Sequence, residues 1–246
     1  MMDGNGKQAG SGPAVYGLQK LSLVDWPGGL AATVFTGGCD LRCPFCYNAS
    51  LVEYEKYKTE KIDLDTVFSF LEERKGLLDA VVLSGGEPLM QPGVEEFAER
   101  VRDMGFIFKL DTNGTYPKRL AALIDAGLVD YVAMDIKNSP EKYARTAGLP
   151  VINISDISES IEVLEKSGID HEFRTTVVRQ FHTPRDLLQI AEWLRGASKY
   201  FIQKFTDPGA LVGDMKLTSY SDEEMQGLKN MLEPYFDEVA VRGADV

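Results

Sequence analysis

Two patterns of apolar and polar residues alternate along the chain, one typical of buried strands and the other of amphipathic helices. Short apolar runs rich in β-branched and aromatic residues predict six buried strands, at residues 30–35, 79–83, 106–110, 131–134, 173–178 and 200–205. Between them, apolar residues recur every three to four positions, which predicts amphipathic helices at about 64–71, 94–101, 117–124, 157–164, 183–194 and 221–232. Residues 15–24 show some alternation and are expected to form a lead-in to the first strand.

Several helix ends in this pattern carry capping residues. Thr183 followed by Pro184 is a favoured helix start, and Ser221 with Glu224 has the spacing of a capping box. The predicted helices are stopped by Gly105, Gly127 and Gly168. The boundary residues and the periodicity therefore place the helices in the same segments.

Strands that alternate with helices predict an α/β fold built on a parallel sheet. The links between helices and strands are short, which favours one compact domain over residues 14–246. A closed eight-unit barrel needs two more repeats than the pattern contains, and periodicity leaves a doubly wound sheet open as an alternative. Residues 1–13 are rich in glycine and polar residues and are expected to form a disordered N-terminal tail.

Composition and charge narrow the classes of function. The chain has 246 residues, of which 44% are hydrophobic, and this is ordinary for a globular protein with a full core. The net charge of −12 argues against a broad nucleic-acid-binding surface, which needs basic patches. No apolar run approaches the roughly 18 residues of a membrane span, and no signal-peptide core is present. Clustered cysteines suit a reducing compartment, so we expect a cytoplasmic protein.

All three cysteines lie in the loop after the first predicted strand. Cys39, Cys43 and Cys46 are separated by three and then two residues, and Gly37 and Gly38 precede them. Thiolates this close in sequence can converge on one metal centre. Three ligands are one short of a closed tetrahedral zinc site or a fully ligated [4Fe–4S] cluster, so one metal position would stay open to chemistry. The alternative is a structural zinc site completed by a distant histidine.

Polar residues and glycines gather where the predicted strands end. In parallel barrels these carboxyl ends share one rim, where the chemistry concentrates. The second to fourth strands are followed by Gly85-Gly86-Glu87, by Asp111-Thr112-Asn113 and by Asp135 with Lys137, and the last two strands carry Arg174, Thr176 and Gln203. Each motif taken singly also fits a turn or an ion pair. Together they indicate one site.

The cysteine spacing, with Phe45 directly before the third cysteine, resembles the signature of the radical S-adenosylmethionine (radical SAM) enzymes. The resemblance covers about residues 15–240 and implies a partial parallel (β/α)6 barrel. It implies a [4Fe–4S] cluster on Cys39, Cys43 and Cys46, whose open iron binds SAM before reductive cleavage to a 5′-deoxyadenosyl radical. The SAM contacts that it implies are Phe45, Tyr47, Gly85, Gly86, Glu87, Asp111, Asn113, Lys137, Arg174 and Gln203.

A closer resemblance is to the glycyl-radical-enzyme activating enzymes. The matching motifs are Asp25-Trp-Pro-Gly28, the Cys-Tyr-Asn at the third cysteine, the Asp-Thr-Asn-Gly after the third strand and the Asp-x-Lys after the fourth. Within that group the chain is most similar to the long-form anaerobic ribonucleoside-triphosphate reductase activating proteins. The group implies a monovalent cation near SAM at Asp111, Thr112 and Asp135, although its methionine is out of register here, at Met134.

The resemblance implies two protein partners, a glycyl-radical enzyme such as anaerobic ribonucleoside-triphosphate reductase, and flavodoxin or ferredoxin as the electron donor. No nucleic-acid or membrane partner is expected, and no catalytic residue is needed beyond the cluster and SAM. Two alternatives remain open: a radical SAM enzyme that acts on a small-molecule or cofactor precursor, and a non-catalytic zinc-binding module. A deep cavity with extra charges on the last two strands favours the first. Bound zinc in place of iron and sulfide favours the second.

Overall fold

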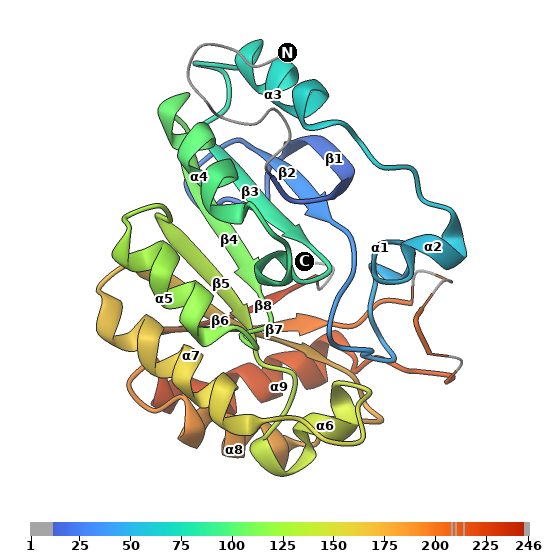
Figure 1. Ribbon diagram of the computed structural model, residues 1–246. Helices are drawn as coiled ribbons and strands as arrows, with labels where there is room; N and C mark the ends of the chain where they lie inside the picture. Colours follow the sequence, from blue (N-terminus) through green and yellow to red (C-terminus); the bar gives the residue numbers. More distant parts are fainter. Residues whose placement is uncertain (1–11, 208, 210, 214, 244–246) are drawn as a thin grey trace.

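One sheet of eight strands, ordered as in the sequence, organises the fold (Figure 1). The computed structural model describes residues 12–207, 209, 211–213 and 215–243, so the predicted tail lies outside the described residues except for Gly12 and Pro13. The strands are β1 (Val15–Ser22), β2 (Ala31–Thr36), β3 (Ala80–Gly85), β4 (Ile107–Thr112), β5 (Tyr131–Asp135), β6 (Asp170–Val177), β7 (Lys199–Lys204) and β8 (Glu238–Arg242).

The strand pairing confirms a partial parallel barrel. β1 runs antiparallel to β2, and every later pair of neighbours is parallel. The six predicted strands are β2 to β7, while β1 was expected only as a lead-in and β8 was not predicted. Strand order in a doubly wound sheet reverses at a switch point, and here it never reverses, which removes that alternative. In the described part of the chain β1 and β8 are the two edges and do not pair with each other.

Six longer helices connect the parallel strands and confirm the helical segments that the sequence predicts. They are α3 (Leu64–Glu72), α4 (Val94–Asp103), α5 (Pro117–Asp125), α7 (Ile154–Ser167), α8 (Pro184–Trp193) and α9 (Asp222–Leu232). All six lie on one face of the sheet and follow its outer, convex side (Figure 1), as expected when successive parallel strands are joined by crossovers of one hand. Within the described residues, no helix combines the length and the apolar composition that a membrane crossing requires.

Short helical segments that the periodicity did not predict complete the fold. They are α1 (Ala49–Val52), α2 (Tyr54–Tyr57) and α6 (Tyr143–Thr146), with the 3₁₀ turns η1 (Pro88–Met90), η2 (Pro140–Lys142) and η3 (Glu233–Tyr235). α1 and α2 stand apart from the layer of longer helices (Figure 1). Four residues are too few to show a period of 3.6, so these segments escape a pattern search.

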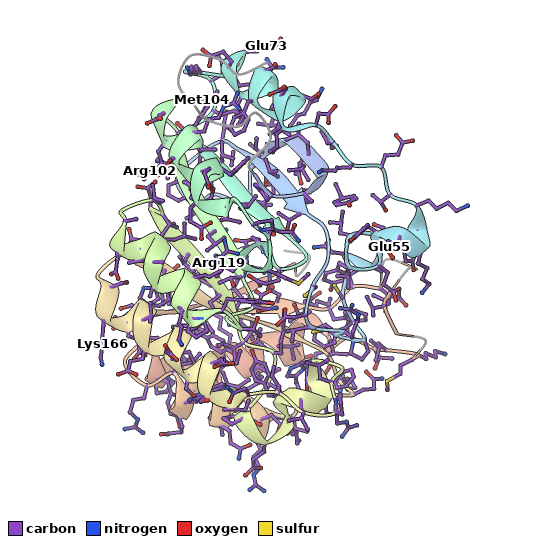
Figure 2. The ribbon with its side chains drawn as sticks, in the orientation of Figure 1. Glu55, Glu73, Arg102, Met104, Arg119 and Lys166 are labelled. Carbon is purple, nitrogen blue, oxygen red and sulfur yellow. The ribbon has the colours of Figure 1, made fainter. Side chains whose placement is uncertain are left out.

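Capping and one arginine fix the helices in place. The predicted cap residues Thr183 and Ser221 both form capping boxes at the starts of α8 and α9. Arg119, labelled in Figure 2, projects from α5 toward α4, where its Nη2 lies 2.7 Å from Glu95 Oε2. Its Nη1 also donates to the carbonyl oxygen of Leu89 in η1, at 2.6 Å. These contacts hold η1, which directly follows the Gly-Gly-Glu motif, against α5.

Alternation along the strands separates an apolar face from a polar one. On β4, Phe108 and Leu110 belong to the main buried hydrophobic cluster, whereas Lys109 pairs with Asp111 at 2.9 Å on the opposite side. The apolar side packs against the helices. The concave side therefore collects the polar residues from which a site can be built.

The turn between β1 and β2 closes the amino-terminal end of the concave face. Asp25 Oδ2 accepts a hydrogen bond from Thr33 Oγ1 at 2.7 Å. Trp26 meets the ring of Tyr131 edge to face, with centroids 5.7 Å apart. The Asp-Trp-Pro-Gly motif thus lies at the end of the strands opposite to their polar carboxyl ends, where it packs rather than lines the candidate site.

Candidate functional site

The cysteine loop is tied to the fold through its backbone. Gly38 N donates to the carbonyl oxygen of Leu51 in α1, and Arg42 N donates to that of Ala147 after α6, both at 2.9 Å. Asn48 Nδ2 donates to the carbonyl oxygen of Gly85 at 2.8 Å. The loop is therefore held from three sides, and its last residue is joined directly to the end of β3.

Glycines are required where other backbone segments touch this loop. A Cβ built on Gly86 would lie 1.7 Å from the carbonyl oxygen of Gly38, and one on Gly148 would lie 1.9 Å from that of Arg42. Real Cβ atoms cannot approach backbone oxygens so closely. Gly86, directly after β3, is thus needed for packing against the cysteine loop, whatever else it binds.

The three cysteines face one cavity of about 220 Å³ at the carboxyl ends of the strands. All are free thiols; Cys43 is buried, and Cys39 and Cys46 are partly buried. Burial raises the pKa of Cys43 to about 12 and also raises the pKa of the other two. Iron binding would displace these protons, because a coordinated thiol is deprotonated outright.

The donor set fits a [4Fe–4S] cluster held by three thiolates. Three sulfurs on one cavity wall can each bind a different iron, and the fourth iron would face the cavity. Among the described residues, no three His, Cys, Asp or Glu side chains are grouped as ligands of a single ion. Leu41 N donates to Cys39 Sγ at 3.4 Å, and Asn113 Nδ2 lies 3.7 Å from the same sulfur. The bond from Leu41 N opposes the rise in the pKa of Cys39 that burial causes, but does not outweigh it.

The structure brings nearly all predicted site residues to the cavity. Those that line it are Cys39, Cys43, Phe45, Cys46, Tyr47, Gly85, Gly86, Asp111, Thr112, Asn113, Asp135, Lys137, Arg174 and Gln203. Glu87 is the predicted residue that does not line it. The cavity wall also includes Leu41, Asn48, Val52, Ser84, Thr176 and Val212.

Glu87 is fully buried beside the cavity, and its carboxylate is hydrogen-bonded to other groups of the protein. Its carboxylate accepts hydrogen bonds from Leu89 N at 2.9 Å, Thr112 Oγ1 at 2.8 Å and Asn113 N at 2.7 Å. Burial raises its pKa to about 7, although these three donors oppose the shift. In this structure Glu87 fixes the loop after β4, and that loop carries Asn113 to the cysteines.

A network of charges covers the opposite wall. Arg174 Nε lies 2.9 Å from Asp135 Oδ1, and its Nη1 lies 3.5 Å from Asp111 Oδ2. Lys109 Nζ holds the other oxygen of Asp111 at 2.9 Å, and Lys137 Nζ holds that of Asp135 at 3.0 Å. Burial alone would raise the pKa of both carboxyls, but Arg174 and the lysines outweigh it. The pKa of Asp111 is lowered, and that of Asp135 falls to about 2.

Two aromatic residues of the cysteine loop have different surroundings. Phe45 is buried against Phe181, with ring centroids 5.6 Å apart. Tyr47 is 45% exposed, stacks on Phe205 at 5.9 Å, and accepts a hydrogen bond from Thr206 N at 2.8 Å. Phe45 thus belongs to the packed floor of the loop, and Tyr47 stands at the rim of the cavity.

Some residues at or beside the cavity were not predicted as site residues, and the strength of their sequence signals differs. Asn48 belongs to the Cys-Tyr-Asn motif, and Ser84 directly precedes the glycine pair. Val212 comes from the long connection after β7 and carries no local signal. His182 is buried; its Nδ1 accepts from Val178 N at 3.1 Å and its Nε2 donates to the carbonyl oxygen of Lys137 at 2.7 Å. It positions the segment after β5.

Comparison with known proteins agrees with this geometry. Residues 33–194 match the Radical SAM superfamily. A protein of Methanocaldococcus jannaschii named "Putative glycyl-radical enzyme activating enzyme MJ1227" is 34% identical over 237 residues, which cover 93% of this chain and 95% of that protein. The 7-carboxy-7-deazaguanine synthase of a Synechocystis strain is 26% identical over 169 residues, which cover 68% of this chain and 71% of that protein.

Solved structures share the fold. A radical SAM methyltransferase from Sphaerobacter thermophilus superposes with a TM-score of 0.65 over 88% of this chain and 67% of its own, at 15% identity. Streptococcus suis SuiB bound to S-adenosylmethionine has a TM-score of 0.65 over 84% of this chain and 48% of its own, at 12% identity. At such identities the likeness concerns the fold alone.

Proposed function

This chain belongs to the radical SAM superfamily, and from that premise we propose that it activates a glycyl-radical enzyme. The observation that carries the proposal is the 34% identity with the glycyl-radical-enzyme activating relative over nearly the whole of both chains. The cofactors of the family are a [4Fe–4S] cluster and SAM. The proposed partner is of the anaerobic ribonucleoside-triphosphate reductase type, with flavodoxin or ferredoxin as electron donor.

In this proposal the protein binds and orients the cluster and SAM and shields them from water, while these cofactors carry out the chemistry. When bound, the cluster supplies the electron that cleaves SAM into methionine and a 5′-deoxyadenosyl radical. Cys39, Cys43 and Cys46 would hold the cluster, and one iron without a cysteine ligand would remain for SAM. The glycine backbone at the end of β3 offers polar groups to the ammonium, and Lys137 with Arg174 offers positive charge to the carboxylate.

Exclusion of water is the second task of the cavity. Leu41, Phe45 and Val52 are buried around the cysteine loop and surround its inner side with apolar side chains. A radical that abstracts hydrogen reacts with whatever lies nearest, so the cavity must exclude competing groups. The intended donor in this proposal is the α-carbon of one glycine on a loop of the partner enzyme, inserted over the rim near Tyr47.

A small-molecule substrate is the second candidate, and the wall of the cavity favours it. Arg174, Thr176 and Gln203 line the cavity on β6 and β7, so the last two strands present polar side chains of the kind that a small polar substrate needs. The 26% identity with a 7-carboxy-7-deazaguanine synthase points the same way. Cofactors, cysteines and SAM contacts are shared by both candidates, so only the acceptor of the radical separates them.

The test is an anaerobic assay of the reconstituted, reduced enzyme beside a Cys43→Ala variant. Wild type is expected to contain iron and sulfide and to convert SAM into 5′-deoxyadenosine. The variant, which lacks one of three cluster ligands, is expected to lose activity at least a hundredfold and to bind less iron. Zinc without sulfide in the wild-type protein, together with no SAM cleavage, would refute a radical SAM enzyme.

The acceptor is identified with deuterium. The candidate partner is prepared with glycine deuterated at the α-carbon, and activation should transfer deuterium into 5′-deoxyadenosine. The unlabelled partner should show a glycyl-radical doublet in the electron paramagnetic resonance spectrum, which collapses in the deuterated partner because the remaining α-hydrogen causes the splitting. Suppose that no candidate partner transfers deuterium or shows the doublet, while a small polar molecule stimulates 5′-deoxyadenosine formation. The proposed activation of a glycyl-radical enzyme is then wrong, and the small-molecule reaction takes its place.

A further inference from the structure

We propose that the guanidinium of Arg174 takes the place of a monovalent cation at the SAM carboxylate, so that SAM binding by this chain needs no added cation. The proposal deepens the proposed function and rests on it, because it concerns how the same cavity holds SAM. It departs from the cation site that the sequence resemblance implies at Asp111, Thr112 and Asp135.

Arg174 stands between the two carboxylates that would have to coordinate the ion. It projects from β6, contacts Asp135 on the adjacent β5 at 2.9 Å, and reaches across that strand toward Asp111 on β4 at 3.5 Å. Its side chain is 12% exposed, so the arrangement is enclosed and poorly screened by solvent. A positive group between two carboxylates on neighbouring strand ends meets the electrostatic need that a bound cation would meet.

The remaining carboxylate oxygens are also matched by fixed charges. Lys109 pairs with the second oxygen of Asp111 and Lys137 with that of Asp135. Three cationic side chains thus face two carboxylates, and a mobile cation would be repelled rather than attracted. Thr112 is engaged elsewhere, since its hydroxyl donates to Glu87 at 2.8 Å and accepts from Gly114 N at 3.1 Å.

The surplus positive charge suits an anionic group of the ligand. Arg174 and Lys137 both line the cavity, and the contacts of Arg174 to the two aspartates use its Nε and Nη1. The guanidinium has five N–H donors in a planar fork that matches a carboxylate. The carboxylate of SAM completes the charge balance of this wall: three positive groups against three negative ones.

The test compares SAM binding in different cations at one ionic strength. Wild-type enzyme, Arg174→Ala and Arg174→Lys are reconstituted anaerobically, and the dissociation constant of SAM is measured by equilibrium dialysis in choline, sodium or potassium chloride. Wild type and Arg174→Lys should bind SAM with the same affinity, within twofold, in all three salts. Arg174→Ala should bind at least tenfold more weakly in choline and recover at least threefold in potassium or in guanidinium at tens of millimolar.

A matched control and a second readout make the test decisive. Arg179→Ala removes an arginine that pairs with Glu224 at the exposed surface, outside the cavity, and should show no cation response. The melting temperature of the metal-free Arg174→Ala protein should rise in potassium relative to choline, whereas that of wild type should not. If Arg174→Ala does not fold, Arg174→Gln takes its place with the same expectations.

Each outcome has a defined meaning. A saturable potassium or sodium requirement in wild type would overturn the proposal, and so would unchanged SAM binding by Arg174→Ala. Weakened binding with no cation response in either readout would show that the emptied position is not a cation site, which also overturns it. If wild type binds no SAM in any salt, the proposed function fails, and the melting temperatures still decide whether Arg174 occupies a cation position.

Discussion

At the scale of one residue, Glu87 shows that the role of a side chain within a motif depends on its contacts in the fold. The two glycines of the Gly-Gly-Glu sequence line the cavity at the end of β3, whereas Glu87 lies buried beside it. In the structure its carboxylate bonds to the backbone of η1 and of the loop after β4. It thereby connects two strand ends that both reach the cavity. Only the fold brings those donors together, since Glu87 and Asn113 are 26 positions apart.

We predict a pH-dependent effect of Glu87→Gln on stability. Burial raises the pKa of Glu87 to about 7, from 4.5 in the unfolded chain, so the folded state retains the proton longer. This contribution to stability is complete below about pH 4.5 and is lost as the pH rises through 7, by on the order of 3 kcal/mol. The stability of wild type above that of Glu87→Gln should therefore be largest near pH 5 and shrink toward pH 8, as measured by denaturant unfolding of the metal-free protein.

The exposed acid Glu99 on α4 provides the control for this prediction. Glu99→Gln introduces the same chemical change where the side chain faces water. If the two variants show the same dependence on pH, the proton on Glu87 does not contribute to stability, and its raised pKa has no thermodynamic effect.

Local sequence predicts candidate site residues well when a turn or a metal-ligand spacing requires particular residue types. It predicts them poorly when a residue reaches the site only through the register of its strand in the sheet. The cysteines, the glycine pair and the Asp-Thr-Asn run were predictable because their spacing and backbone needs are local. The part played by Lys109 was not, since a lysine in a strand is ordinarily solvated. Here it is 2% exposed and pairs with Asp111 on the concave face. That outcome depends on curvature of the whole sheet.

At the scale of elements, the cysteine loop and the end of β3 form one unit. Gly86 N donates to the carbonyl oxygen of Thr36 at 3.0 Å, and Glu87 N donates to that of Gly38 at 2.9 Å. These bonds continue the β2–β3 pairing past the ends of both strands. The positions of the three cysteines therefore depend on Gly86, which is not itself a proposed cluster ligand.

We predict that Gly86→Ala displaces the cysteine loop. The new Cβ would lie 1.7 Å from the backbone oxygen of Gly38, so one of the two segments must move. Loss of the two backbone bonds and of local packing should cost about 2–4 kcal/mol of unfolding free energy. The reconstituted variant should also bind less iron per chain than wild type, which chemical analysis measures.

Gly227→Ala is the matched control for this change. Gly227 lies within α9, and nothing lies within 4 Å of the position that its Cβ would take. Because alanine favours helix over glycine, this variant should be stabilised by up to about 1 kcal/mol and keep its full iron content. Equal iron content in both variants would show that the loop tolerates a side chain at Gly86.

The elements missed by the sequence pattern are those at the edges of the sheet. β8 spans only Glu238–Arg242 and has no fully buried residue, so it lacks the continuous apolar run of the central strands. β1 has several exposed positions and pairs with β2 through an irregular register. Edge strands bury less surface and therefore need fewer apolar residues. Periodicity detects the burial of a strand, so it detects β2 to β7 more readily than their neighbours.

At the scale of the whole molecule, charged side chains from β4, β5, β6 and β8 form ion pairs across the concave face. Near the cavity, Arg174 on β6 pairs with Asp135 on β5 and with Asp111 on β4. Closer to the amino-terminal end, Arg242 on β8 makes two bonds to Glu172 on β6, at 2.6 and 2.9 Å. β7 lies between them, so this pair fixes the curvature of the last three strands. A sheet open at both edges needs such cross-links.

We predict that Arg242→Ala destabilises the protein mainly by loosening β8. Glu172 is 1% exposed and keeps only the hydroxyl of Tyr131, at 2.7 Å, when the arginine is removed. Removing one partner of a buried pair usually costs about 3–5 kcal/mol, and since Arg242 is one third exposed we expect about 2 kcal/mol. Amide hydrogen exchange should accelerate first in β8. The double mutant Arg242→Ala/Glu172→Gln should regain part of the lost stability, because it removes the unpaired buried charge, and a double-mutant cycle measures the coupling of the two residues.

Arg179→Ala, which breaks an exposed pair with Glu224, should change stability far less. Equal losses in the two arginine variants, with unchanged exchange in β8, would mean that the curvature of the sheet is set by apolar packing against the helices instead of by charges on its concave face.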